Sequence, residues 1–382
     1  MNKLTCFDVL IVYTETMTSS ASNSSSDNQT PFPIGSRNET YNTVYGYFLE
    51  VCNDLNLKAA FTTSADIIGS GSCSSFWIFK NKKWTKVNSP CFSSLIFDKF
   101  SPINNNIKSR RQLLFSSNNI KPFNDPSLFN LFFDKQKTYD ELSDHSIPTI
   151  SLENNLQSIN DACNELTKLI NYHPESQDFS QDIIIMKDRF GAGGRRIYKF
   201  KSGESEKMLE VINKNSNFSF IVQPFAKFDK GFSYGDYFSS TDIRLVYLKG
   251  KIIQSYIRVA KEGDFRCNEH QGGLLTYLSL KEIPSFLIKK SNSIAKILDK
   301  KCSLYALDFI ISNSGKPYLL EGNTGPGLDW NMSIKKNELK SKKLIRLVVK
   351  ELALRSDTHS PSVISVNLPN IKSVELRFPN LA

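Results

Sequence analysis

The sequence predicts a protein of the mixed α/β and α+β class with several domains, and three observations support this prediction. The chain has 382 residues, which is enough for two or three domains with a sizeable core. Short apolar segments alternate with an amphipathic helical segment up to about residue 120, whereas β-hairpin patterns dominate after Phe218. Asn124-Asp125-Pro126, between these two parts, has the composition of a domain boundary.

The part before this boundary is expected to form a small sheet with flanking helices. Residues 41–55 have the apolar spacing of a helix, with Tyr45 and Phe48 on its apolar face. Residues 19–36 are rich in Ser and Asn, and such a polar segment is expected to be a mobile loop. The expected strands are 7–13, 58–63 and 94–97, with a hairpin of 75–79 and 83–87 around Asn81-Lys82.

The part after the boundary combines helices with two clear β-hairpins. Lys249-Gly250 and Ser314-Gly315 are turn dipeptides between apolar segments, which is the pattern of a hairpin. Residues 356–382 are expected to form a loose tail with one strand at 371–376. The other expected elements are helices 127–142, 155–169, 282–298 and 339–354, a strand that starts at Ile150, and strands 218–225, 242–248, 251–259, 303–311 and 318–323.

Composition and charge narrow the class of ligand. The formal net charge is +10, but the lysines are spread along the chain without a dense basic block, so an anionic ligand is favoured over nucleic acid. No apolar run approaches the roughly 20 residues of a membrane span, and the N-terminus lacks the pattern of a signal peptide. The seven cysteines are scattered without C-x-x-C spacing, which indicates reduced thiols in the cytoplasm. With only four histidines, a zinc site is not expected.

The stretch DIIIMKDRFGAGGRRIYKF, residues 182–200, places Lys187 at the end of an apolar strand and before a glycine-rich turn. A P-loop would need Gly-Lys-Ser or Gly-Lys-Thr and a dinucleotide fingerprint would need G-x-G-x-x-G, and neither spacing is present. A lysine charge beside turn amides can still hold nucleotide phosphates, and the alternative is a plain glycine hairpin with a surface lysine. Lys135, or its near-equal rival Lys137, is expected to supply a second charge.

The hairpin ALDFIISNSGKPYLLEGNTGPG, residues 306–327, carries the candidate metal site. If Ser314-Gly315 is a two-residue turn, Asp308 lies directly opposite Glu321, and strand alternation puts Asn323 on the same face. Because their neighbours on that face are apolar, the two carboxylates are expected to repel each other until a divalent cation binds. An all-oxygen set of this kind suits Mg²⁺. The alternative is that either carboxylate pairs with a lysine at a solvated edge.

The segment RVAKEGDFRCNEHQGG gathers Arg258, Arg266 and Asn268 near one loop. Arginine suits phosphoryl groups and carboxylates because its guanidinium is planar and always charged, although any one arginine could be a surface residue. In an ideal preceding hairpin, Asp242 and Arg258 fall on opposite faces. Either a bulge brings the two together, or they serve different parts of the site.

The order of these segments resembles the ATP-grasp superfamily, and most closely its RimK-type and glutathione-synthetase-like ligases. The order is a lysine on a helix, a strand-Lys-Gly turn, a Gln-x-Phe hinge, D-I-R, GDFRCNEHQGG, and an Asp hairpin followed by E-x-N. The resemblance covers about residues 124–350, and GDFRCNEHQGG is its most specific piece. It implies two α+β lobes that clasp ATP, 124–215 as the central lobe and 216–355 as the C-terminal lobe, between a pre-ATP-grasp α/β domain, 1–123, and the tail, 356–382.

The resemblance also implies roles for individual residues. Backbone groups at 223–226 would contact adenine, and Asp242 would lie near the ribose. Two positions depart from the family pattern, since Pro224 replaces a usually acidic hinge residue and Cys267 replaces a frequent serine. The implied nucleotide-binding residues are Lys135, Lys187, Gly191, Gly193, Gly194, Gln223, Pro224, Phe225, Ala226, Asp242 and Cys267; the catalytic residues are Arg258, Arg266 and Asn268; and the Mg²⁺ ligands are Asp308, Glu321 and Asn323.

The activity implied by the resemblance is that of an ADP-forming ligase, which joins a carboxylate to an amine or thiol through an acyl phosphate. It would use ATP with Mg²⁺, or Mn²⁺ in its place, on small-molecule or peptide substrates, and a homo-oligomer is compatible with the pattern. Three alternatives stay open: a ligase that builds ester or amide crosslinks in a precursor peptide, a non-catalytic ATP-binding regulator, and a nucleic-acid-binding protein. The regulator would be expected to lack a metal ligand, and the nucleic-acid-binding protein would need a basic cluster that the sequence does not show.

Overall fold

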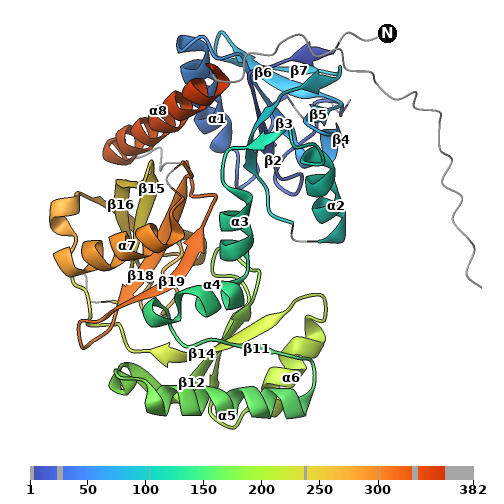
Figure 1. Cartoon of the computed structure of the whole chain (residues 1–382). Coiled ribbons are helices and arrows are strands. Elements are labelled where there is room, and N and C mark those ends of the chain that lie inside the picture. The colour runs from blue at the N-terminus through green and yellow to red at the C-terminus, as the bar shows by residue number, and fades with distance from the viewer. Residues whose placement is uncertain are drawn as a thin grey trace, which may run out of the picture.

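The computed structural model describes residues 4–23, 29–102, 104–235, 239–300, 302–328 and 334–357, and within them the strands form four sheets (Figure 1). Two sheets belong to the N-terminal part, and the others have four and five strands. The expected tail strand at 371–376 lies outside the described residues. Among the described helices, none is both long enough and apolar enough to cross a membrane.

The larger N-terminal sheet has the order β10-β9-β2-β3-β6-β7. Its central strand β2 is buried at every position because parallel neighbours β3 and β9 cover both edges and helices cover the faces. The hairpin around Asn81-Lys82 is confirmed, with both turn residues in the left-handed region. The elements are β2 (Val9–Tyr13), α1 (Tyr41–Asp54), β3 (Ala59–Thr63), β6 (Phe76–Lys80), β7 (Lys83–Val87), β9 (Leu95–Lys99), α2 (Asn105–Leu114) and β10 (Lys121–Pro122), beside a small sheet of β1 (Thr5–Cys6), β8 (Cys91–Phe92), β5 (Ser72–Cys73) and β4 (Ile67–Gly69).

The expectation of a mobile loop at 19–36 is wrong for its described residues, 19–23 and 29–36, which pack against the N-terminal sheet. Phe32 is fully buried, and Asn42 of α1 bonds both its backbone N–H and its carbonyl. The indole of Trp77 donates to the carbonyl of Ser19. The polar composition of this segment predicted that it would be exposed to solvent. Burial of the Phe32 ring instead holds it against the sheet.

The four-stranded sheet has the order β11-β14-β12-β13, from β11 (Ile150–Leu152), β14 (Phe220–Ala226), β12 (Phe179–Asp188) and β13 (Ile197–Lys201). Helices α5 (Leu156–Tyr172) and α6 (Ser205–Lys214) cover one face (Figure 1). The apolar face of α5 is buried, and the Asn155 side chain caps it by accepting from the N–H of Ser158. The opposite face of the sheet is thereby left for the cavity described below.

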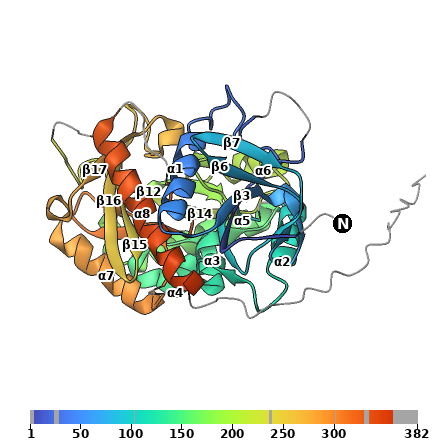
Figure 2. The same ribbon diagram turned by 90° about the horizontal axis from the view of Figure 1, so that it is seen from above.

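The five-stranded sheet has the order β17-β16-β15-β18-β19 and is covered on both faces. Helix α7 (Ser285–Leu298) packs on one face, and α8 (Lys335–Asp357) packs between the other face and α1 (Figure 2). Alternate residues of the strands therefore face two different helices. The strands are β15 (Thr241–Leu248), β16 (Lys251–Val259), β17 (Leu274–Leu278), β18 (Tyr305–Ile311) and β19 (Pro317–Asn323).

The single helix expected at 127–142 is two helices, α3 (Pro126–Phe133) and α4 (Lys135–Leu142), separated at Asp134. The Asp134 carboxylate accepts from the N–H groups of Gln136 and Lys137 and pairs with Arg189. This capping holds Asp134 in an extended conformation that a continuous helix does not allow. Lys135 consequently becomes the first residue of α4, close to the glycine-rich turn.

The two predicted hairpins form, each with one irregularity. In the first, a shift between Val246 and Tyr247 brings Asp242 directly opposite Arg258, so the bulge alternative is confirmed. In the second, Ser312 pairs with Lys316 around a three-residue turn, and the two-residue turn expected at Ser314-Gly315 is wrong. A compensating bulge between Asp308 and Phe309 restores the expected pairing of Asp308 with Glu321.

Candidate active site

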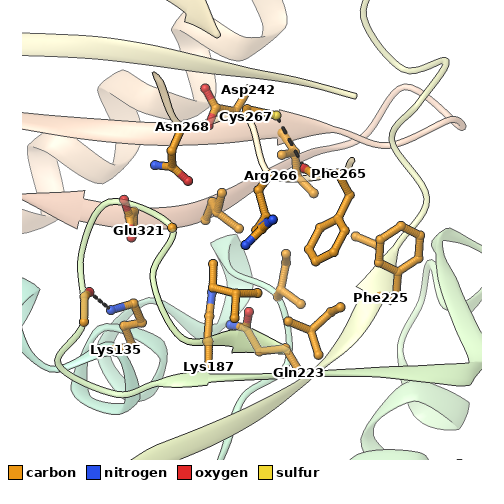
Figure 3. A pocket seen from close by; sticks show the side chains of 18 of the residues that line it. Lys135, Lys187, Gln223, Phe225, Asp242, Phe265, Arg266, Cys267, Asn268 and Glu321 are labelled. Atoms are coloured by element: carbon orange, nitrogen blue, oxygen red, sulfur yellow. Dashed lines mark hydrogen bonds between the residues drawn. The ribbon is translucent and has the colours of Figure 1, made fainter. Parts of the chain in front are cut away.

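A cavity of about 840 Å³, including its solvent-open part, lies between the four-stranded and five-stranded sheets. Figure 3 shows Lys135 and Glu321 toward one end and the rings of Phe225 and Phe265 at the other. Of the residues expected at the site, Gly193, Asp308 and Asn323 do not line this cavity. The expected residues that do line it are Lys135, Lys187, Gly191, Gly194, Gln223, Pro224, Phe225, Ala226, Asp242, Arg258, Arg266, Cys267, Asn268 and Glu321.

Lys187, on β12, is a buried cation with no hydrogen-bond or ion-pair partner among the described residues. Its side chain lines the cavity, and only 6% of the residue's surface is exposed. Burial lowers the pKa of Lys187 to about 7, and the nearby ammonium of Lys135 acts in the same direction. An anion in the cavity would relieve this cost, so the site fits the phosphates of a nucleotide.

Of the two lysines considered for a second charge, Lys135 lines the cavity, whereas Lys137 is exposed and lies outside it. The ammonium of Lys135 donates to the carbonyl of Gly191 and so joins α4 to the glycine-rich turn. Burial lowers the pKa of Lys135, while the carboxylates of Glu321 and Asp188 oppose this shift. The choice between the two lysines, which sequence reasoning left open, is made by the break at Asp134.

The glycine-rich turn needs its glycines because it touches the loop that follows β16. A Cβ at Gly194 would lie 2.6 Å from the side-chain oxygen of Asn268, and Gly194 also has a positive φ of 70°. The Gln271 amide donates to the carbonyl of Gly193 at 3.3 Å. Gly193 therefore acts through its backbone rather than by lining the cavity. The two loops together close one side of the cavity.

The other end of the cavity is apolar and suits a flat aromatic base. Phe225 and Phe265 meet edge to face with ring centroids 5.6 Å apart, and Ile185 and Ile310 line the cavity with them. The Gln223 side chain has a structural role, because its amide donates a hydrogen bond of 2.7 Å to the Thr149 hydroxyl. Recognition at the hinge is thereby left to the backbone and to the ring of Phe225.

Beside the cavity lies a buried network of charges that the sequence did not predict. The Arg258 guanidinium forms two hydrogen bonds of 2.8 Å to Asp242 and one of 2.7 Å to Asp308. Arg244 binds both carboxylate oxygens of Asp308. Burial acts to raise the pKa of Asp308, but the guanidiniums of Arg244 and Arg258 outweigh burial and hold this pKa at about 2. Burial raises the pKa of Asp242 to about 6 against the opposing pull of Arg258.

This network corrects the expectation that Asp308 and Glu321 face each other without a counter-charge. Arg244 lies between them, with its guanidinium 3.9 Å from Glu321, so their repulsion is already relieved. The alternative that either carboxylate pairs with a lysine at a solvated edge is also wrong, because the partners of Asp308 are buried arginines and the ion pair of Glu321 is with Arg244. Arg244 is the residue that sequence reasoning missed. The sequence feature that could have identified Arg244 is strand alternation, because Arg244 lies two residues after Asp242 and therefore on the same face of the strand.

The oxygen donors of the second hairpin fit Mg²⁺ only in part. Glu321 is the accessible member, because its side chain is 24% exposed and lines the cavity. The Asn323 side-chain oxygen accepts from the N–H of Gly325, and Asp308 is committed to its arginines. Within the described residues, no three His, Cys, Asp or Glu side chains are grouped to hold a metal. Coordination by all three residues would require Asp308, which is fully buried and does not line the cavity, to become accessible to the ion.

Arg266, Cys267 and Asn268 come from the loop after β16. Arg266 is partly exposed and pairs with Asp264 at 2.8 Å. The Cys267 thiol is buried against the carbonyl of Ser240, and burial raises its pKa, so it is not a nucleophile. Asn268 lines the cavity near Glu321 in Figure 3. The loop thus offers one guanidinium and one amide to a ligand.

Comparisons with known proteins agree with this geometry. The RimK-like ATP-grasp domain family matches residues 135–348. A probable alpha-L-glutamate ligase of Maridesulfovibrio salexigens is 29% identical over 157 residues, which are 40% of this chain and 49% of that protein. The chain therefore spans about half the length of that curated relative.

Among solved structures, the D-alanyl-alanine synthetase A of Vibrio cholerae aligns with a TM-score of 0.55 and 16% identity, covering 92% of this chain and 99% of that one. The ATP-grasp ligase PsnB, complexed with a phosphomimetic variant of its minimal precursor, Mg and ADP, aligns with a TM-score of 0.50 and 12% identity over 91% and 99%. At these identities the likeness shows the fold alone, and it confirms the fold class expected from the sequence.

Proposed function

The chain belongs to the RimK-like ATP-grasp family, and from this premise we propose that it is an ADP-forming ligase that joins a carboxylate to an amine. One observation carries the proposal: at its polar end the cavity has a buried lysine that is unpaired among the described residues, and at the other end it has an aromatic wall in which Phe225 and Phe265 meet edge to face. Lys187 and Lys135 would hold the phosphates of ATP, and Phe225 with the backbone of 223–226 would hold adenine.

In the proposed reaction, a carboxylate oxygen of the substrate attacks the γ-phosphorus of ATP, and ADP leaves. The amine nitrogen then attacks the carbonyl carbon of the acyl phosphate, and inorganic phosphate leaves as the amide forms. The chain's residues bind and orient the reactants, since phosphoryl transfer needs position and charge neutralisation rather than a protein nucleophile. Mg²⁺ held by Glu321, Asn323 and Asp308 would neutralise phosphate charge, and Mn²⁺ is the alternative ion.

The catalytic roles expected for three residues are refined by their positions. Arg258 is buried in the network with Asp242 and Asp308, so we propose that it mainly positions these carboxylates. Arg266 and Asn268 line the cavity from a loop, and we propose that they contact the transferred phosphoryl group or the acyl substrate. Asp242 would reach the ribose only through the part of its carboxylate that Arg258 leaves open.

The proposed substrates are a small-molecule or peptide carboxylate and an amine. The curated relative is named a probable alpha-L-glutamate ligase, and the macrocyclase MdnC has a solved structure bound with the precursor peptide MdnA, so small-molecule and peptide substrates are both represented among similar proteins. A non-catalytic regulator is less well supported because Asp308, Glu321 and Asn323 are all present. The domain limits, the cytoplasmic location and a homo-oligomeric state remain predictions from the sequence.

The proposal is tested by the nucleotide product. Purified protein with Mg²⁺ and ATP should release ADP and phosphate when a carboxylate and an amine are supplied together. Anion-exchange chromatography separates ADP from AMP in the same run. AMP with pyrophosphate as the product would refute an acyl-phosphate mechanism. No nucleotide turnover across a broad panel of acids and amines would favour the regulator.

A further inference from the structure

A second cavity, of about 730 Å³ including its solvent-open part, adjoins the first. The two share Lys135, Gly191, Ala192, Gln223, Leu320 and Glu321, and of these Lys135, Gly191 and Glu321 lie at the proposed phosphate end of the first cavity. A molecule in the second cavity can therefore reach the phosphates of a bound nucleotide at Lys135. This is where a carboxylate that receives the γ-phosphoryl group must be placed.

The second cavity is walled by aromatic side chains. Phe129 and Phe133 of α3 are stacked with ring centroids 5.5 Å apart, and Phe133 and Phe190 are stacked at 5.1 Å. The Arg111 guanidinium lies 4.1 Å from the ring centroid of Phe129 and is itself paired with Asp98, which holds the ring in place. This wall offers an extended apolar surface to a ligand.

Charge inside the second cavity is confined to its junction with the first. Lys135 and Glu321 are the only charged side chains among the described residues that line it. Two arginines lie against its aromatic wall, and both are already paired, Arg189 by two hydrogen bonds of 2.7 Å to Asp134 and Arg111 with Asp98. The deeper part therefore has no cation among its described lining residues to neutralise a second carboxylate, and burying one there would be costly.

One polar group in this cavity has no partner. The Ser146 hydroxyl is buried and makes no hydrogen bond with any described residue, although the residue is only 7% exposed. The neighbouring hydroxyls of Thr138 and Thr149 are satisfied by backbone carbonyls. A ligand could therefore make a hydrogen bond to Ser146, while the aromatic wall offers it apolar contacts.

We propose that the second cavity binds the carboxylate substrate, and that the body of this substrate is uncharged and aromatic or bulky aliphatic. The inference rests on the proposed ligase function, because it assumes that the acid must reach the phosphates at Lys135. It separates this chain from enzymes that act on an acidic amino acid. The stacked rings of Phe129, Phe133 and Phe190 would determine the specificity.

Direct binding tests the proposal without turnover. Calorimetry should compare 3-phenylpropanoate with glutamate, with and without Mg²⁺ and a non-hydrolysable ATP analogue. Wild type should bind 3-phenylpropanoate at least about tenfold more tightly, and Phe133→Ala should lose at least about tenfold of that affinity, in line with the loss of contacts in an apolar pocket. Phe225→Ala is the matched control, since Phe225 lines only the first cavity, and it should weaken the nucleotide but not the acid.

Three results would count against the proposed substrate pocket. Equal or tighter binding of glutamate, unchanged binding in Phe133→Ala, or no binding of either acid would overturn the proposal. If Phe133→Ala does not fold, Phe190→Ala removes a ring from a turn instead of a helix and carries the same expectation. If 3-phenylpropanoate binds as expected but no ADP forms with any amine, the substrate pocket stands and the ligase function fails.

Discussion

At the scale of single residues, the site combines a lysine that has no charged partner among the described residues with an aspartate that has two arginine partners. Lys187 is buried and unpaired among the described residues, whereas Asp308 is fully buried and held by Arg244 and Arg258. Both states cost free energy that a ligand could change, because a phosphate would pair the lysine and a cation would compete for the carboxylate. Substitution of Lys187 is therefore expected to affect mainly ligand binding, and substitution of Asp308 mainly the stability of the fold.

Lys187 should make nucleotide affinity depend on pH. Only the ammonium form pairs with phosphate, and its pKa in the free protein is about 7, so affinity should fall as pH rises from 7 to 9. Calorimetry of ADP binding in wild type and Lys187→Ala separates this effect from titration of the nucleotide itself. The variant should also bind ADP more weakly by about 1.5–3 kcal/mol. Lys137→Ala, at an exposed position, is the control, and a profile shared by all three proteins would contradict the role of Lys187.

Asp308 and Glu321 should respond differently to loss of charge. Asp308→Asn leaves two buried guanidiniums short of a counter-charge, so it should lower the free energy of unfolding by about 3–5 kcal/mol. Glu321→Gln removes a more exposed carboxylate whose nearest cation is 3.9 Å away, so stability should be nearly unchanged. Urea unfolding without metal measures both variants.

The same two variants test the metal site. If Glu321 is the accessible Mg²⁺ ligand, Glu321→Gln should lose Mg²⁺-dependent ADP release while it melts like wild type. A Glu321→Gln protein that keeps its Mg²⁺ response would show that the metal is not held there. An Asp308→Asn protein as stable as wild type would show that its arginine pairs contribute little.

At the scale of elements, two local breaks in regular structure build the site. The interruption between α3 and α4 turns Lys135 toward the glycine-rich turn, and the bulge at Ile253 in β16 aligns Asp242 with Arg258. Each break has an identifiable cause, a capping carboxylate in the first case and an extra residue in the second. Neither requires the strands and helices around it to change their pattern.

The glycine-rich turn should not tolerate a methyl group at Gly194. Gly194→Ala puts a Cβ 2.6 Å from the Asn268 oxygen, so either the Asn268 side chain or the turn must move, and the contact between the two loops changes. Gly263→Ala is the matched control, with a positive φ of 79° and no atom within 4 Å of its Cβ. Both should pay about 1–2 kcal/mol for left-handed alanine, but only Gly194→Ala should weaken ADP binding severalfold. Equal ADP affinities in calorimetry would show that the close approach of the two loops is dispensable.

At the scale of the whole molecule, α8 joins parts of the chain that are distant in sequence. Its buried face belongs to one apolar cluster with α1 and the N-terminal sheet as well as with β15 and β18. The cavity lies on the five-stranded sheet that this helix supports. Loss of packing at α8 should therefore affect the N-terminal part and the site together.

Two leucines of α8 test this joint. Leu352 is fully buried in the shared cluster, whereas Leu354 is 56% exposed. Leu352→Ala should lower the free energy of unfolding by about 2–5 kcal/mol because it leaves a cavity. Leu354→Ala, with the same chemical change two residues away, should stay within about 0.5 kcal/mol of wild type. Urea unfolding followed by circular dichroism gives both values, and similar losses would mean that α8 does not join the two parts through its buried face.

The sequence by itself determined the family, both hairpins and most of the longer helices and strands. Turn dipeptides such as Lys249-Gly250 and period-two alternation predicted both hairpins. Counting from a two-residue turn also paired Asp308 with Glu321, and this pairing holds because a bulge offsets the three-residue turn that forms. These predictions depend on local backbone geometry, which neighbouring residues fix. The order of motifs from Lys135 to Asn323 was enough to identify the family, because it needs no knowledge of contacts.

Only the tertiary structure decided which charges meet. Arg244 and Asp308 are 64 residues apart, and nothing local predicts that their side chains form a buried pair. The choice of Lys135 over Lys137 and the packing of Phe32 likewise depended on contacts with distant segments. Electrostatic and burial free energies depend on distance and on exclusion of water, and both are set when sheets and helices pack together.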